Sequence, residues 1–206
     1  TDTDLEFAAS SSVNVSTTGT GAIDLDGRGA LTLSDVDTAD GTITVTSAGA
    51  LTVTDVATGN NNAIALTTAS GDITGLATVN AGSGNVTLNS AGAIADDGST
   101  GTVVTGGVLT ADAAGAITID STVTSADIST SAAGAIALDE TDGITLTDLD
   151  TTDGSITVSA GGALTATDVV AGGGTGDSVT LSTTTGGAVA TLVTGADAVS
   201  ITADAG

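Results

Sequence analysis

The chain carries an internal duplication of 39 residues, which recurs without a gap 113 positions downstream. GAIDLDGRGALTLSDVDTADGTITVTSAGALTVTDVATG (residues 21–59) returns as GAIALDETDGITLTDLDTTDGSITVSAGGALTATDVVAG (residues 134–172), and 23 of the 39 positions are identical. Self-similarity at a fixed spacing is the signature of repeat architectures, in which each unit packs against copies of itself. A chain built in this way favours a scaffold or an extended surface over a single catalytic pocket.

A shorter period lies inside the duplication. Leu31 is followed by Leu51 twenty residues later, whereas the step is 23 from Ile94 to Ile117 and 19 from Ile117 to Ile136. A step near twenty residues, with insertions at turns, is typical of one coil of a β-solenoid. The 206 residues then make about ten coils, and stacking at about 4.8 Å per coil gives a rod of about 50 Å.

The local pattern predicts strands. Leu31 and Leu33 alternate with Thr32 and Ser34, so the aliphatic side chains point to one side of an extended segment. The alternation breaks at the Asp35–Val36 pair, where we expect a corner. Glycines between the runs suit turns and close approach of coils. No segment shows a 3.6-residue period, so we expect essentially no helix.

These observations predict an all-β fold, a parallel β-helix (β-solenoid) of about ten coils, each of roughly 20 residues. We expect one solenoid segment over residues 1–206, with repeat units 21–92 and 134–206 and intervening coils over 93–133. The open edges of the end coils invite strand pairing. They predict either a fragment of a longer rod or end-to-end stacking into a filament.

Composition excludes several classes of function. Arg28 is the only basic residue and the formal net charge is −24, so nucleic acid and anionic membrane surfaces are not expected partners. No run of about 18 apolar residues occurs, so we expect no membrane insertion. The chain has no His or Cys, which excludes the common nucleophilic arrangements.

Sugar-cleaving sites usually combine paired acids with basic or aromatic side chains, which Arg28 and Phe7 alone cannot supply. We therefore expect no enzyme activity. Arg28 is expected to be a solvated turn residue beside Asp26, and Thr141 replaces it in the second copy.

Two matching acidic segments are the strongest chemical candidates. They are DVDTADG and DLDTTDG, and their carboxylates are those of Asp35, Asp37, Asp40, Asp148, Asp150 and Asp153. Clustered carboxylates on a turn are the ligands that Ca²⁺ prefers, so Ca²⁺ is the cofactor to consider. The alternative is that Asp favours turns and keeps a rod soluble. If Asp35 lies over Asp55, their repulsion is about 1 kcal/mol in water, and calcium or salt should stabilise the rod.

Outward threonines suggest a second hypothesis. T-x-T patterns such as Thr42, Thr44 and Thr46 could order water on a flat solenoid face, as in ice-binding proteins. The pattern is interrupted at Thr74–Leu76, and Thr is also simply a good solvent-facing strand residue.

The GAI/GAL-x-L/V openings and the stretches Asp139–Val158 and Ala81–Ile94 resemble the β-strand repeats of filamentous-haemagglutinin-like adhesins of Gram-negative bacteria. The resemblance implies a right-handed parallel β-helix, secretion to the cell surface and a role as an adhesive or spacer stalk. The secretion domain of that family usually carries Asn-Pro motifs. This chain has no proline, so that domain is not expected within these residues.

We therefore expect a non-catalytic structural segment of an extracellular surface fibre or adhesin stalk. Its partners would be further copies of itself, end to end or laterally, or the surface of a host or neighbouring cell. A self-assembling filament subunit is the alternative, and an ice-binding solenoid is a minor one.

Overall fold

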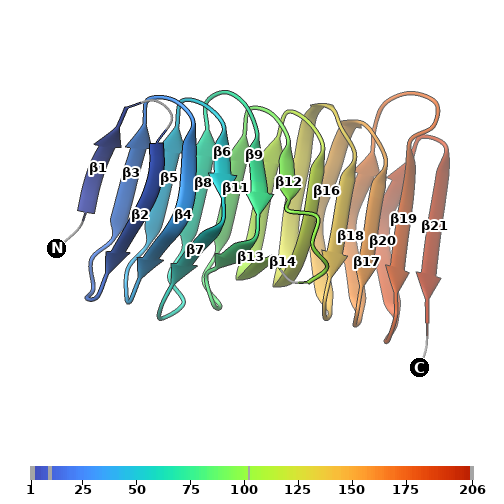
Figure 1. The fold of residues 1–206 in the computed structure, drawn as a ribbon. Helices are drawn as coiled ribbons and strands as arrows, with labels where there is room; N and C mark the ends of the chain where they lie inside the picture. Colours follow the sequence, from blue (N-terminus) through green and yellow to red (C-terminus); the bar gives the residue numbers. More distant parts are fainter. Residues whose placement is uncertain (1–2, 9–10, 102, 205–206) are drawn as a thin grey trace.

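The computed structural model describes residues 3–8, 11–101 and 103–204, which form one parallel sheet of 21 strands and no helix. Successive strands wind into stacked coils, so that the chain runs as a rod from β1 at one end to β21 at the other (Figure 1). The prediction of an all-β solenoid is confirmed. Its coil length is confirmed as well, because Leu31 pairs with Leu51 and Ile23 pairs with Ile43 on successive coils.

Two long ladders run the length of the rod, and we call them ladder A and ladder B. Ladder A comprises β1 (Thr3–Phe7), β3 (Ile23–Gly27), β5 (Ile43–Ser47), β8 (Ile64–Thr68), β11 (Val86–Ser90), β16 (Ile144–Asp153), β18 (Leu164–Ala171) and β20 (Ala188–Gly195). Ladder B comprises β2 (Ser11–Thr17), β4 (Leu31–Thr38), β6 (Leu51–Val53), β9 (Ile73–Leu76), β12 (Ile94–Asp96), β15 (Ile136–Glu140), β17 (Ile156–Ala160), β19 (Ser178–Thr183) and β21 (Ala198–Ala203). The remaining strands are β7 (Asp55–Thr58), β10 (Thr78–Asn80), β13 (Val104–Ala113) and β14 (Ile117–Ala133).

Two long strands join the halves of the rod. The last residues of β13 continue ladder A from β11, and the first residues of β14 continue ladder B from β12. Further along its length, β14 pairs with β16 and so also carries ladder A. The step between paired residues varies along the ladders, from a short one between Leu109 and Ala126 to a long one between Ala166 and Ala190.

The aliphatic residues form one continuous core along the rod. In β3 the burial alternates strictly, with Ile23 and Leu25 fully buried and the intervening Asp24 exposed. Each buried side chain lies over its equivalent on the next coil, as Ile23 does over Ile43. The core therefore consists of aliphatic columns, and stacking supplies the burial that a single coil of small residues lacks.

The expected break in the alternation at Asp35–Val36 is confirmed, but it is a β-bulge within one continuous strand, β4, and not a corner between two strands. The register between β2 and β4 shifts at this point, because Val13 pairs with Leu33 whereas Asn14 pairs with Asp35. The extra residue bends the strand and returns the next side chain to the interior.

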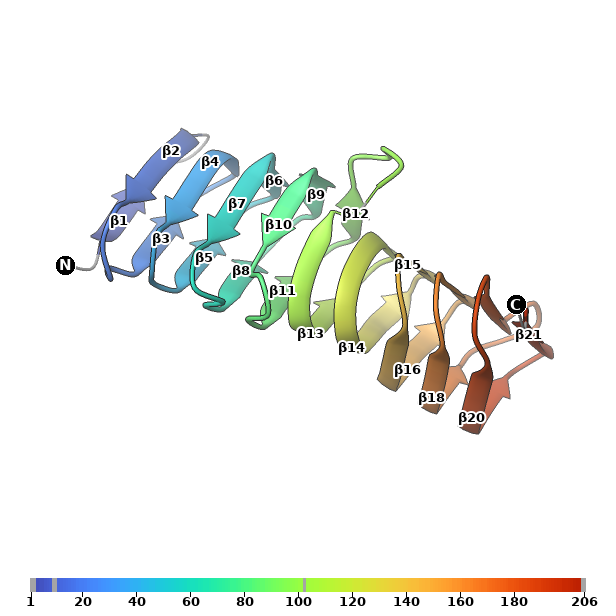
Figure 2. The ribbon, with the colours of Figure 1, turned by 90° about the horizontal axis from the view of Figure 1, so that it is seen from below.

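The two copies of the duplication lie on different ladders. Ile23 belongs to ladder A, whereas its sequence equivalent Ile136 pairs with Ile117 and Ile156 in ladder B. The 113-residue spacing therefore corresponds to a whole number of coils plus one half. Figure 2 shows β13 and β14 as long curved strands where this exchange occurs. Each coil thus consists of two similar half-coils, and either can occupy either ladder.

Candidate functional site

The predicted acidic segments lie mainly on strands. Asp35 and Asp37 belong to β4, and Asp40 lies in the turn that follows it. In the second copy, Asp148, Asp150 and Asp153 all belong to β16. The expectation that these carboxylates gather on a turn was therefore wrong, because the bulge lets the strand continue past the expected corner.

The bulges place carboxylates of neighbouring coils next to one another. Asp127 of β14 pairs directly with Asp148 of β16, and a register shift precedes this pair. We call Asp35, Asp37 and Asp55 the first acidic stack. We call Asp112, Asp127, Asp148, Asp150 and Asp168 the second acidic stack.

Partial burial, followed by like-charge crowding, raises carboxyl pKa values in both stacks. In the first, partial burial raises the pKa of Asp37, and the hydrogen bond and charge of Asp35 add to the effect. In the second, partial burial raises the pKa of Asp127, followed by the charge of Asp148. The pKa of Asp150 is raised by burial and then by the charges of Asp148 and Asp168. These stacks therefore disfavour full ionisation.

Some of these carboxylates accept hydrogen bonds from asparagine side chains. Asn14 Nδ2 donates to Asp35 Oδ2 at 3.1 Å, and Asn62 Nδ2 donates to Asp40 Oδ1 at 3.1 Å. Within the described residues, no group of three or more carboxylates is placed to hold a metal ion. Calcium binding by Asp35, Asp37, Asp40, Asp148, Asp150 and Asp153 stays a prediction.

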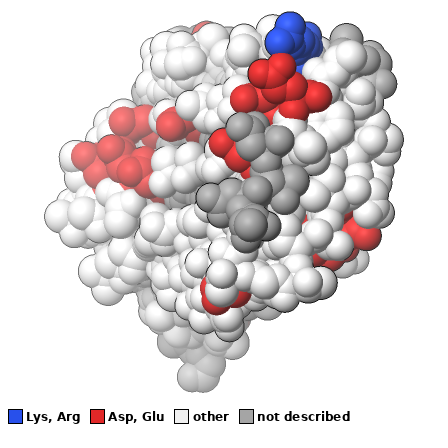
Figure 3. All heavy atoms as spheres, turned by 90° about the vertical axis from the view of Figure 1, so that its left-hand side faces the viewer, with Lys and Arg blue, Asp and Glu red and all other residues white. Residues whose placement is uncertain are grey.

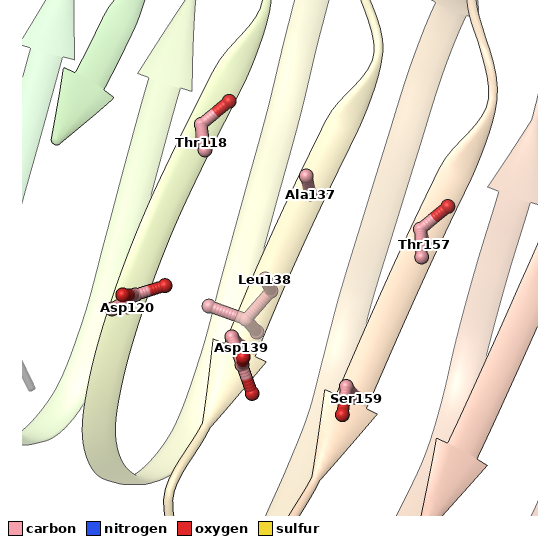
Figure 4. Close-up of a pocket in the computed structure, with 7 residues that line it drawn as sticks. All are labelled: Thr118, Asp120, Ala137, Leu138, Asp139, Thr157 and Ser159. Carbon is pink, nitrogen blue, oxygen red and sulfur yellow. The ribbon is translucent and has the colours of Figure 1, made fainter. Parts of the chain in front are cut away.

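A shallow depression of about 180 Å³ lies on the outer side of β14, β15 and β17. Its lining residues form two rows across the strands, with Leu138 of the core behind them (Figure 4). The rows are Thr118, Ala137, Thr157 and Asp120, Asp139, Ser159. The hollow exists because the outward side chains at these positions are small. It is smaller than typical ligand pockets, which hold about 300–1,000 Å³.

The depression contains an acid pair that was not among the predicted site residues. Asp120 pairs with Asp139 on the neighbouring coil. Burial raises the pKa of Asp120, and the charges of Asp96, Asp139 and Asp97 add to this. Two such carboxyls could exchange protons with a sugar. No basic or aromatic residue lines the depression to bind one.

Arg28 is paired differently from expectation. Its Nη2 donates to Glu6 Oε2 at 2.8 Å on the preceding coil, so the proposed pairing with Asp26 was wrong. Both side chains are largely exposed, and such a pair contributes little stability. Viewed from the N-terminal end, the basic side chain adjoins an acidic patch and further acidic patches lie apart around the rod (Figure 3).

Glu140 is a buried acid that was not among the predicted site residues. It is 1% exposed and lies in the interior at the end of β15. Its Oε2 accepts hydrogen bonds from Ser121 Oγ at 2.6 Å and from the Val123 amide at 3.0 Å. Burial raises its pKa, and these hydrogen bonds oppose the rise. The alternation of Ile136, Leu138 and Glu140 along the strand could have indicated this burial, because it points all three side chains inward.

The outward threonines lie where the pattern predicted. Thr44, Thr46 and Thr52 are exposed. On the outer side of ladder B, Thr32, Thr52 and Thr74 form one row across three coils. Further along the same ladder, Thr118 pairs with an alanine on each side, Ala95 and Ala137. The regular T-x-T surface is therefore broken in the middle of the rod.

No family model matches the chain, and comparisons with curated proteins and with solved structures give no match. Among the described residues there is also no helix that could cross a membrane.

Proposed function

We propose that this chain is a non-catalytic structural segment of an extracellular surface fibre or adhesin stalk, which acts as a rigid spacer. The observation that supports this proposal most directly is the pair of unbroken ladders from β1 to β20 and from β2 to β21 around one aliphatic core. Parallel ladders satisfy the backbone of every interior coil, so length is gained by adding coils without any change in the cross-section.

The surface supports a passive role. The depressions hold about 150 to 200 Å³ and are lined mainly by Ser, Thr, Ala and Asp. The acidic surface keeps the rod soluble and opposes side-by-side contact at low salt. A stalk of this kind would project from the cell surface, so the proposed location is outside the cell.

The spacer function predicts that removing one coil shortens the rod by one coil spacing. Spin labels at Thr52→Cys and Thr180→Cys lie on exposed positions of ladder B six coils apart, at about 29 Å with 4.8 Å per coil. Deletion of residues 136–155 joins Ala135 to Ile156, which occupies the same column as Ile136. We expect the label distance to fall by about 5 Å.

Deletion of residues 23–42 is the matched control, because it removes one coil outside the labelled interval. It should leave the label distance unchanged while the circular dichroism stays that of a β-protein. Unfolding of both deletion variants would contradict the modular spacer. Cleavage of a polysaccharide that Asp120→Asn abolishes would overturn the non-catalytic assignment.

A further inference from the structure

The two end coils expose side chains that are buried everywhere else along the rod. Val199 of β21 is 45% exposed and Ile201 is 42% exposed, whereas Val179 and Leu181, their column neighbours, are 0% exposed. Leu5 of β1 is 36% exposed at the opposite end. Within the described residues, no strand covers the outer edges of these coils.

We propose that the end coils are complementary and that the first coil of a second copy stacks on the last coil of this chain. In this joint β1 of the second copy pairs with β20 and β2 pairs with β21, in parallel. The proposal concerns the chain of residues 1–206 by itself. It goes beyond the spacer function, which would stand if the joint did not form.

Side-chain size favours this arrangement in ladder A. Phe7, the only aromatic residue of the chain, lies over Gly27. The same column then holds only small residues and ends at Gly195. The joint would place Phe7 between two glycines, Gly195 of one copy and Gly27 of its own. Two residues earlier in the same strand, Leu5 would lie over Val193.

Ladder B continues equally well across the joint. Following its columns places Val13 of the second copy over Ile201, and Ser11 over Val199. Outward positions place Ser12 over Ser200. Inside the joint, Val13 and Ile201 join aliphatic to aliphatic, whereas Ser11 sets a small hydroxyl side chain on Val199. Outside the joint, Ser12 and Ser200 join hydroxyl to hydroxyl.

The joint also avoids the like-charge contacts found between interior coils. Glu6 lies over Asp26 within the chain, and the column of Asp26 ends at Thr194. Across the joint, Glu6 would therefore face a neutral residue. Neither β20 nor β21 contains a charged residue. No carboxylate of the last two strands opposes the approach of a second copy.

The order of strands is in phase as well. The last described strand, β21, belongs to ladder B, and β1 belongs to ladder A, so the alternation of ladders continues without interruption. Because the two surfaces differ and lie at opposite ends of the rod (Figure 1), the contact is heterologous. Its repetition gives an open-ended chain of copies.

Cysteine crosslinking tests the register, since the chain has no cysteine of its own. In the double variant Ser12→Cys/Ser200→Cys, facing Cα atoms of adjacent coils would be about 4.8 Å apart, within disulfide range. Oxidation of the purified chain should give a ladder of covalent multimers on a non-reducing gel. In the control Ser12→Cys/Thr202→Cys the second cysteine is displaced by two residues, and multimers should be at least fivefold less abundant. Equal yields from both pairs would overturn the proposed register.

Sedimentation velocity on the chain without cysteines tests the contact itself. We expect concentration-dependent species at whole-number multiples of the monomer mass of 19.1 kDa. Val199→Asp places a charge in the joint and should leave only monomers. Ser200→Asp adds the same charge one residue away on the outer side and should still assemble. A monomeric wild-type chain at all concentrations, or assembly of Val199→Asp equal to that of Ser200→Asp, would overturn the proposal.

Discussion

Among the described glycines, Gly161 is the one where an added Cβ would come closest to the backbone of a neighbouring coil, and it gives the sharpest test of the fold. A Cβ atom built on Gly161 would lie 2.0 Å from the backbone oxygen of Thr141 on the preceding coil. Gly187 occupies the corresponding turn one coil further along, and a Cβ there would have no heavy atom within 4 Å. Neither residue has a positive φ, so the pair Gly161→Ala and Gly187→Ala differs mainly in coil contact.

The expected cost follows from this distance. Relief of the overlap needs the Cβ–oxygen distance to rise from 2.0 Å to at least 3.0 Å, so the coils must separate locally by about 1 Å. Two backbone hydrogen bonds of 2.8 Å lie beside the contact. The Gly161 amide donates to the Glu140 carbonyl oxygen, and the Gly162 amide donates to the Asp142 carbonyl oxygen. Such a separation breaks both. At about 0.5–1.5 kcal/mol each, plus residual strain, Gly161→Ala should lose about 2–4 kcal/mol.

Thermal unfolding followed by far-ultraviolet circular dichroism measures this effect, because the chain has no Trp or Tyr for fluorescence. At about 2–4 °C per kcal/mol for a chain of this size, the Tm of Gly161→Ala should fall by about 4–16 °C. Gly187→Ala should raise the Tm by about 1–4 °C, because Ala restricts the unfolded chain by about 0.4–1 kcal/mol. A Tm for Gly161→Ala within about 1 °C of that for Gly187→Ala would refute this stacking geometry.

Three further predictions concern the acidic residues. Burial raises the pKa of Glu140 above its ordinary 4.5, so the protonated form is favoured in the folded state and the Tm should fall as pH rises from about 4.5 through the raised pKa. Glu140→Gln should flatten this decline of the Tm, and an unchanged slope in the variant would contradict the role of Glu140. Asp148→Asn removes the charge that faces Asp127 and should raise the Tm at low salt. It should not raise the Tm at about 1 M salt, where charges are screened over about 3 Å. A gain in Tm that does not depend on salt would argue against charge repulsion as the cause. Calcium should raise the wild-type Tm above that in chelator at matched ionic strength, and identical values would remove any specific calcium site.

The fold could be predicted from the sequence because two independent patterns agree. Alternation in segments such as Leu31–Ser34 predicts which side chains point inward. The twenty-residue step from Leu31 to Leu51 predicts which residues of neighbouring coils lie over one another. Even the uneven steps at Ile94, Ile117 and Ile136 are confirmed by the strand pairing.

Other features lay beyond the sequence for physical reasons. Both half-coils carry the same G-A-aliphatic opening, so nothing local specifies that Ile23 joins ladder A and Ile136 joins ladder B. Arg28 was assigned a partner near in sequence, whereas stacking brings Glu6 within reach. By contrast, the pairing of Asp120 with Asp139 follows the same 19-residue step as Ile117 and Ile136, so the sequence could have indicated this acid pair.

The distribution of charge and apolar surface decides which contacts between copies are favourable. Stacked carboxylates such as Asp127 and Asp148 lie along the sides of the rod, where they repel a second rod that approaches laterally. The uncharged strands β20 and β21 expose Val189, Leu192, Val199 and Ile201 at one end, where burial of apolar surface favours contact. Since salt weakens the lateral repulsion and leaves the apolar term in place, axial assembly should dominate at low salt. Lateral bundling should follow only when salt is raised, in an order that light scattering can record.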